Sequence, residues 1–211
     1  MISVFEPRLS INDKYSVIKT LFKNEISGTS PIVQEFEKSA AKSFNRDHAV
    51  AVSNGSIALD LAFQLIDFSD GDEVVLPSFT IVSCLSAVVR AKAVPVFCDV
   101  NKDTWNMTFE DVKSKITKRT KAVLVVHLYG LTAEIEKIEK YCNENNIILI
   151  EDAAEAHGQI AGNRKCGSFG LISTMSFYAN KHVTTGEGGL LLTNNKEVKK
   201  KADLMRNLGF R

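Results

Sequence analysis

Short apolar runs alternate along the chain with stretches whose apolar positions recur at helical spacing. The spacing predicts helices over residues 12–22, 31–44 (opening at Ser30-Pro31), 56 onward, 80–91, 109–116, 134–145 and 196–208. The runs that predict strands are HAVAV, EVVLP, AVPVFCDV, KAVLVVHLYG, IILIEDAA, ISTMSFY and GLLLTN. Nearly continuous apolar strands separated by helices indicate an α/β fold: a three-layer α-β-α arrangement with a mostly parallel, mixed sheet.

Length and charge narrow the class of protein. The 211 residues suffice for one large domain, and 45% hydrophobic with 24% charged residues is typical of a globular protein. Lys plus Arg number 26 against 25 for Asp plus Glu, so nothing favours nucleic acid as a partner. There is no apolar stretch of membrane-spanning length and no signal-peptide pattern in MISVFEPRLS. We therefore expect a cytoplasmic protein without a membrane partner.

The cysteines show no metal-binding pattern. Cys84, Cys98, Cys142 and Cys166 form no C-x-x-C pair, and none has a histidine at ligand spacing. We therefore predict reduced, idle thiols and no metal site.

Two acids stand at the end of the strand IILIED. Glu151 and Asp152 follow four apolar residues, and a charge at the end of a buried strand is unfavourable unless it has a partner. Asp152 could cap a following helix, or it could point into a functional site. The fragment alone does not choose between the two.

Lys181 lies in SFYANKHVTTGEGG, after one strand-like run and before another. A loop lysine is usually a solvated charge. The glycines of GEGG could suggest a dinucleotide loop, but such a loop lies between a strand and a helix. A Rossmann-type nucleotide binder is therefore disfavoured.

The segment VSNGSIALDLA runs from a strand through Gly55 and Ser56 into a helix. Such a turn directs backbone N–H groups and a helix N-terminus at one point, which suits a phosphate. Taken alone, it could equally be a plain turn.

The three segments together fit pyridoxal phosphate chemistry. That cofactor needs a lysine amine for a Schiff base, an acid against its pyridine nitrogen and a phosphate cradle. Lys181, Asp152 and the turn at Gly55 and Ser56 supply these parts. The released lysine can also move a proton as a general base.

The same stretches resemble the DegT/DnrJ/EryC/StrS family of sugar aminotransferases, whose fold is that of aspartate aminotransferase (fold type I). The matching stretches, in family order, are VSNGSIALDLA, GDEVVLPSFT, AVPVFCDVNKDTWN, RTKAVLVVHLYG, IEDAAEAHG, CGSFG, SFYANK and TTGEGG. The resemblance implies that Lys181 holds pyridoxal 5'-phosphate and that Asp152 pairs with its pyridine nitrogen. Gly55, Ser56 and Ser176 would bind the phosphate.

The resemblance also implies roles at less certain positions. Glu155 would lie near the ring hydroxyl of the cofactor. Ile81 stands where relatives usually carry an aromatic that stacks on the ring, so it would cover the ring with less contact area. His157 could lie near the cofactor or be a hydrogen-bonded structural residue, and His127 could organise a loop. His182 is given no catalytic role.

The activity that the resemblance implies is transamination of a nucleotide-linked 4-keto-6-deoxy sugar, with L-glutamate as a typical donor. DTWN, EDAAEAHG and NK-x-x-TTGEGG are most similar to members that form perosamine from GDP-4-keto-6-deoxymannose, a sugar type of surface polysaccharides such as O-antigen. Family members are homodimers and continue into a smaller second domain. We therefore expect residues 1–211 to be the N-terminal, large cofactor-binding domain, with the small C-terminal domain absent. The alternative is a truncated, catalytically incomplete remnant, or one subunit of a split enzyme that needs a C-terminal partner.

Overall fold

A seven-stranded sheet forms the centre of the computed structural model, which describes residues 6–209. The strand order is β1-β9-β8-β5-β4-β2-β3. Strand β9 runs antiparallel to both of its neighbours, whereas the other paired strands are parallel. This confirms the predicted mostly parallel, mixed sheet. The strands are β1 (His48–Val52), β2 (Glu73–Pro77), β3 (Val94–Cys98), β4 (Thr120–Val126), β5 (Ile148–Asp152), β8 (Ile172–Ser176) and β9 (Gly189–Thr193).

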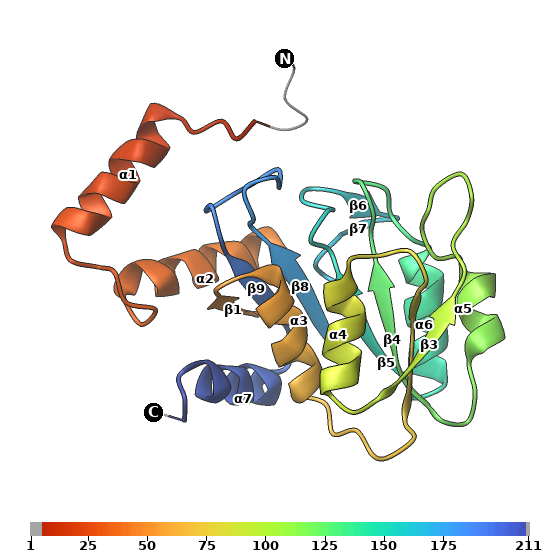
Figure 1. Ribbon diagram of the computed structural model, residues 1–211. Coiled ribbons are helices and arrows are strands. Elements are labelled where there is room, and N and C mark those ends of the chain that lie inside the picture. Colours follow the sequence, from red (N-terminus) through yellow and green to blue (C-terminus); the bar gives the residue numbers. More distant parts are fainter. Residues whose placement is uncertain (1–5, 210–211) are drawn as a thin grey trace.

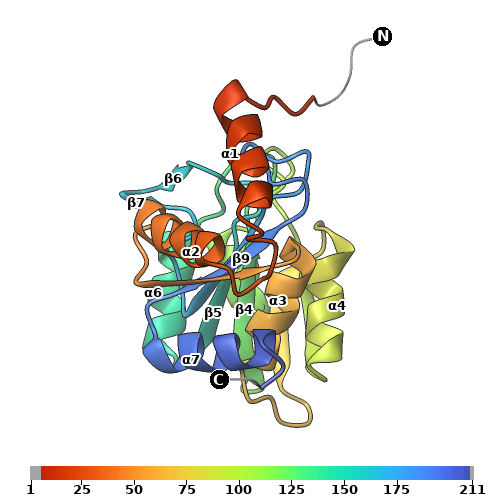
Figure 2. The same ribbon diagram turned by 90° about the vertical axis from the view of Figure 1, so that its left-hand side faces the viewer.

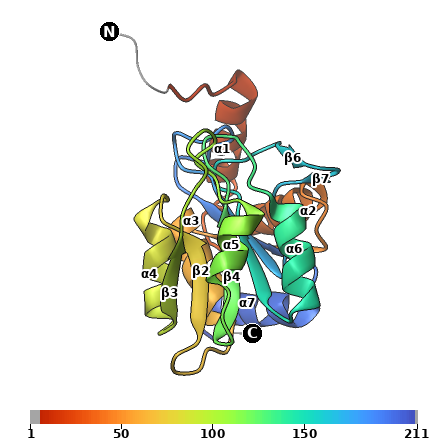
Figure 3. The same ribbon diagram turned by 90° about the vertical axis from the view of Figure 1, so that its right-hand side faces the viewer.

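Helices cover both faces of the sheet, which confirms the three-layer arrangement (Figures 1 and 2). Seen from the β3 edge, α3 and α4 lie on one side of the strands and α5 and α6 on the other (Figure 3). The helices are α1 (Ile11–Phe22), α2 (Pro31–Ser43), α3 (Gly55–Gln64), α4 (Val82–Arg90), α5 (Phe109–Lys115), α6 (Ile135–Glu144) and α7 (Lys196–Arg206).

Alternation along the strands divides the core into two layers. Val74 and Leu76 pack with residues of α3, α4 and α7, whereas Val75 between them packs with residues of α2, α5 and α6. Successive side chains of a strand point to opposite faces, so a sheet covered twice needs apolar residues at every position. This is why the strands appear as continuous hydrophobic runs in the sequence.

Helix α1 stands apart from the rest of the chain (Figure 1). Its first turn is closed by a capping box, in which the Asp13 N–H donates to Ser10 Oγ over 3.1 Å and the Ser10 N–H donates to Asp13 Oδ2 over 2.7 Å. None of its residues is buried. The helix therefore depends on local capping rather than on the core.

Several predicted boundaries move in the structure. Strand β4 ends at Val126 rather than continuing through HLYG, because Tyr129 and Gly130 adopt left-handed backbone conformations. A two-stranded hairpin of β6 (Ile160–Ala161) and β7 (Arg164–Lys165) was not predicted. Strands of two residues are too short to produce an alternating pattern.

The cysteines agree with the expectation of reduced thiols. All four cysteine thiols are buried and free. Within residues 6–209, no helix is both long and apolar enough to cross a membrane.

The fold requires glycine at position 170. It has a φ of +66°, and a Cβ there would lie 2.4 Å from the carbonyl oxygen of Leu149 on β5. We predict that Gly170→Ala lowers the free energy of unfolding by on the order of 3 kcal/mol, measured by urea denaturation. Gly71→Ala is the control, because Gly71 has a φ of +84° and open space around it. It should lose only about 1 kcal/mol, and equal losses would contradict the steric explanation.

Candidate active site

The two acids at the end of β5 point to opposite faces of the sheet. The register of β5 and β8 pairs Glu151 with Ser173 and Asp152 with Thr174. Each acid therefore meets a different hydroxyl group from the same neighbouring strand. The two carboxylates have separate surroundings and separate roles.

Glu151 has a complete set of hydrogen-bond donors. Its Oε1 accepts from the Gly167 N–H over 2.7 Å and from His127 Nε2 over 3.1 Å. Its Oε2 accepts from the Phe169 N–H over 2.9 Å and from Ser173 Oγ over 2.7 Å. Glu151 is fully buried, and these bonds replace the water that it has lost. It ties β5 to the segment that leads into β8.

Arg46 reinforces this side from the loop before β1. Its Nη2 donates to Ser173 Oγ over 2.7 Å, and its Nε donates to the Gly167 carbonyl over 3.1 Å. A buried carboxylate is stable only when it is paired and hydrogen-bonded, and Arg46 supplies the nearby positive charge. Glu151 is thus a structural residue.

Asp152 has fewer and longer hydrogen bonds. Its Oδ1 accepts from the Ala154 N–H over 3.0 Å and from Thr174 Oγ1 over 3.3 Å, and its Oδ2 lies 3.5 Å from Cys84 Sγ. Burial raises the pKa of Asp152, while these donors and the charge of Lys181 lower it. No helix begins after Asp152, so it is not a helix cap; the chain enters a turn instead.

Lys181 lies in the segment that joins β8 to β9, and its amine points to Glu155. The distance from Lys181 Nζ to Glu155 Oε1 is 3.2 Å, and Glu155 Oε2 accepts from the Tyr129 N–H over 3.0 Å. The lysine side chain is only 15% exposed. A lysine held in this way differs from a solvated surface charge, because its amine is paired with Glu155 and its charge acts on the buried acid Asp152.

The N-terminus of α3 meets the end of β8. Asn54 caps the helix by accepting from the Ile57 N–H over 2.9 Å, so the first-turn N–H groups of Gly55 and Ser56 have no intrahelical acceptor. A Cβ on Gly55 would lie 2.8 Å from Ser176 Cβ. Only glycine allows this approach, which brings Gly55, Ser56 and Ser176 together.

Sequence reasoning missed Ser83, in the first turn of α4. Its hydroxyl lies 2.7 Å from Ser56 Oγ. The signal was present in the sequence, because EVVLPSFTIVS repeats the strand-to-helix transition of VSNGS. Ile81, the residue at the start of α4, is 64% exposed. Its exposed side chain is available to a ligand, and its contact with a cofactor ring stays a prediction.

The GEGG turn connects two antiparallel strands, β8 and β9, rather than a strand and a helix. This arrangement contradicts a dinucleotide-binding loop. Gly189, at its end, packs directly against the backbone of Asn54 and Gly55. The turn thus supports the N-terminus of α3 from behind.

His127 has a structural position at the end of β4. Its Nδ1 accepts from the Ala133 N–H over 3.1 Å, so the ring proton is on Nε2, which donates to Glu151. His127, Glu151 and Cys166 are the one group in residues 6–209 with the spacing of metal ligands. Because the ring nitrogens and both carboxylate oxygens already have hydrogen-bond partners, we assign no metal to this group.

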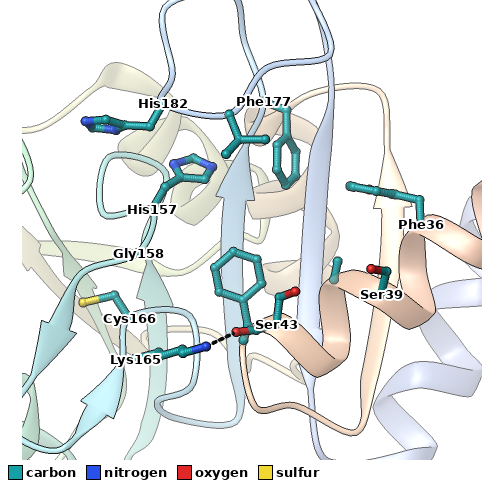
Figure 4. Close-up of a pocket in the computed structure, with 12 residues that line it drawn as sticks. Phe36, Ser39, Ser43, His157, Gly158, Lys165, Cys166, Phe177 and His182 are labelled. Carbon is teal, nitrogen blue, oxygen red and sulfur yellow. Dashed lines mark hydrogen bonds between the residues drawn. The ribbon is translucent and has the colours of Figure 1, made fainter. Parts of the chain in front are cut away.

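The ring of His157 lies close to the backbone of Ser176 and is largely buried. Among the described residues, neither of its ring nitrogens has a hydrogen-bond partner. Its ring packs edge-on against Phe177 at 5.4 Å, and burial lowers its pKa to about 4. Figure 4 shows it with His182 on one side of a pocket of about 440 Å³, opposite Phe36 of α2. The pocket adjoins the segment that carries Lys181.

Three exposed aromatic side chains pack against one another after strands β2, β3 and β4. Trp105 contacts Phe79 and Tyr129 edge-on, with ring centroids 5.4 and 5.9 Å apart. The three rings come from the segments after β3, β2 and β4, at the carboxyl ends of parallel strands. In sheets of this type ligands bind at that edge.

The site thus combines a directed lysine, a buried acid and a helix N-terminus with free N–H groups. The profile of the DegT/DnrJ/EryC1/StrS aminotransferase family matches residues 10–211. This chain belongs to that family. Membership in this aminotransferase family agrees with the pyridoxal phosphate chemistry expected from the sequence.

Individual members of the family support the assignment. The chain is 38% identical to GDP-perosamine synthase of Vibrio cholerae over 209 residues, which are 99% of this chain and 57% of the relative. It is 40% identical to GDP-perosamine synthase of Escherichia coli O157:H7, covering 93% of this chain and 54% of the relative. The crystal structure of the aminotransferase TlmJ from Streptoalloteichus hindustanus superposes with a TM-score of 0.93 at 35% identity, covering 100% of this chain and 58% of that one. The chain therefore spans about half the length of these family members.

Because Glu151 and Asp152 lie on opposite faces of β5, we predict opposite effects on stability for the two corresponding amide substitutions. Glu151→Gln places an amide NH₂ against N–H and O–H donors in the core, so it should lower the free energy of unfolding by about 3 kcal/mol. Asp152→Asn should instead stabilise the cofactor-free chain at neutral pH. Because the pKa of Asp152 is raised in the folded state, its protonated form favours folding. This contribution to stability is fully present below pH 3.8 and is lost as pH rises through the folded-state pKa, whereas a neutral amide has no charged form to bury.

Urea denaturation of the two variants between pH 4 and 8 measures both effects. The Asp152→Asn curve should flatten with pH compared with the unmodified chain. A Glu151→Gln variant as stable as the unmodified chain would show that Glu151 does not tie β5 to the segment that leads into β8.

Proposed function

We propose that residues 1–211 form the cofactor-binding unit of an aminotransferase that uses pyridoxal 5'-phosphate. The observation that carries the proposal is the convergence of Lys181, Asp152 and the Gly55–Ser56 turn at one edge of the sheet. Each of the three is ordinary alone. Together they offer an amine, an acid and an anion site to one ligand.

The residues present fit the cofactor. Lys181 is close enough to Asp152 for its charge to lower the pKa of that acid, so the amine and the acid interact electrostatically. The hydroxyls of Ser56 and Ser176 and the first-turn N–H groups of α3 suit a phosphate dianion, which the helix dipole also favours. The close approach of Gly55 to Ser176 gives this cradle its shape.

The cofactor, when bound, supplies a ring that accepts electrons from the substrate carbon. Asp152 would hold a proton on the pyridine nitrogen through its buried carboxylate. Lys181 Nζ would hold the cofactor and move a proton between carbon atoms. Glu155 would direct Nζ and accept hydrogen bonds near the ring hydroxyl, since its Oε1 already faces the amine.

For the substrate, we propose a nucleotide-linked 4-keto-6-deoxy sugar, with an amino donor such as L-glutamate. The support is the 38% and 40% identity to two GDP-perosamine synthases. We also propose that the active protein is a homodimer, as the resemblance to the family implies.

The second candidate function is that of one subunit of a split aminotransferase. In this candidate the 211 residues, which match 54% to 57% of the two GDP-perosamine synthases, bind the cofactor but turn over substrate only together with a second polypeptide. Cofactor binding without turnover, restored to activity by a second polypeptide, would favour this candidate.

We predict a covalent adduct between pyridoxal phosphate and Lys181. The chain is incubated with the cofactor, reduced with borohydride and mapped by mass spectrometry. The adduct should be on Lys181 because its amine is held in one direction, and Lys181→Ala should abolish it. Lys200→Ala, at an exposed position of α7, is the control and should keep the adduct. Labelling spread over many lysines would contradict the proposal.

We predict that Ser56→Ala weakens binding of pyridoxal phosphate about tenfold, through loss of one hydrogen bond to a charged group. The same variant should bind pyridoxal, which lacks the phosphate, as the unmodified chain does. Fluorescence titration with both ligands separates the effects. An equal loss for the two ligands would place Ser56 away from the phosphate.

A further inference from the structure

Cys84 lies against the candidate catalytic acid and has no assigned role. It is fully buried on α4, with its Sγ 3.5 Å from Asp152 Oδ2 and 3.3 Å from Thr80 Oγ1. Both distances suit hydrogen bonds of sulfur. Thr80, Cys84 and Asp152 thus form a chain of contacts from the start of α4 to the end of β5.

The proton of the Cys84 thiol stays on its sulfur atom. Burial and the neighbouring Asp152 raise the pKa of Cys84 well above its ordinary value, so the group is a thiol throughout the working range of pH. A thiol can donate one hydrogen, and the carboxylate oxygen can only accept. The contact is therefore an S–H donor facing Oδ2.

The two oxygens of Asp152 differ in how they are held. Oδ1 accepts from the Ala154 N–H and from Thr174 Oγ1, whereas Cys84 is the donor that the described residues offer to Oδ2. Without Cys84, the plane of the carboxylate would be fixed from one side alone. The S–H group orients Oδ2. Because it is a weak donor, Oδ2 keeps most of its capacity to accept a stronger hydrogen bond.

We propose that Cys84 is a positioning residue, whose thiol donates to Asp152 Oδ2 and fixes the carboxylate that faces the cofactor ring. The proposal rests on the proposed function for its second half. The hydrogen bond itself belongs to the cofactor-free chain and can be measured there.

The first test is the infrared S–H stretching band of the cofactor-free protein, assigned to Cys84 by its loss in Cys84→Ala. A bond to a carboxylate should place this band at lower frequency than that of Cys142, which is buried on α6. Asp152→Asn presents an amide NH₂ to the sulfur, so the Cys84 band should move to higher frequency while the Cys142 band stays. A Cys84 band that ignores Asp152→Asn would overturn the proposal.

The second test compares two thiol deletions with cofactor present. Cys84→Ala should weaken binding of pyridoxal phosphate about three- to tenfold and shift the pH midpoint of the bound cofactor's absorbance. Cys142→Ala removes an equally buried thiol from the opposite layer of the core and should change neither. Cys84→Ser, which keeps a donor, should restore the affinity.

The outcomes separate this inference from the proposed function. If the unmodified chain forms no adduct at Lys181, the proposed function fails, and the infrared result still decides whether Cys84 holds Asp152. If the adduct forms and Cys84→Ala behaves like Cys142→Ala in both affinity and absorbance, Cys84 has no positioning role.

Discussion

The structure depends on two buried carboxylates at the end of β5. The chain places Glu151 and Asp152 side by side in sequence, and strand geometry sends them to opposite faces. Each charge must be matched where water is excluded. Glu151 is matched by two backbone N–H groups, a serine hydroxyl and a histidine, so the segment that leads into β8 is fixed against β5.

The charge of Asp152 has fewer and weaker hydrogen-bond donors than that of Glu151, and this difference separates the roles of the two residues. A carboxylate with four short donors has little left for a ligand, whereas one with long contacts to Thr174 and Cys84 still gains from a strong donor. Burial, which makes the charged form of Asp152 unfavourable when no cation faces it, increases that gain. The same geometry therefore lowers stability and creates affinity for a protonated ring nitrogen.

Much of this was predictable from the sequence. The apolar runs indicated a sheet covered on both faces, and the positions of Asp152, Lys181 and Gly55 followed from polar residues at strand ends. The functions of Glu151 and Asp152 could not be separated, because that requires the register against Ser173 and Thr174. Cys84 and Ser83 were missed since their direction depends on the helical phase of α4, which begins at Val82 rather than at residue 80.

The close approach of α3 to β8 sets the position of the first turn of α3. Gly55 accepts no side chain because Ser176 occupies that space, and Gly189 packs on the same turn from behind. These contacts hold the first turn of α3 at the same edge of the sheet as Asp152 and Lys181, without any bond between the three. The spacing of amine, acid and anion site is thus a property of the sheet and its helices. Rigid elements rather than flexible loops therefore set the geometry for the ligand, apart from Lys181, whose direction depends on Glu155.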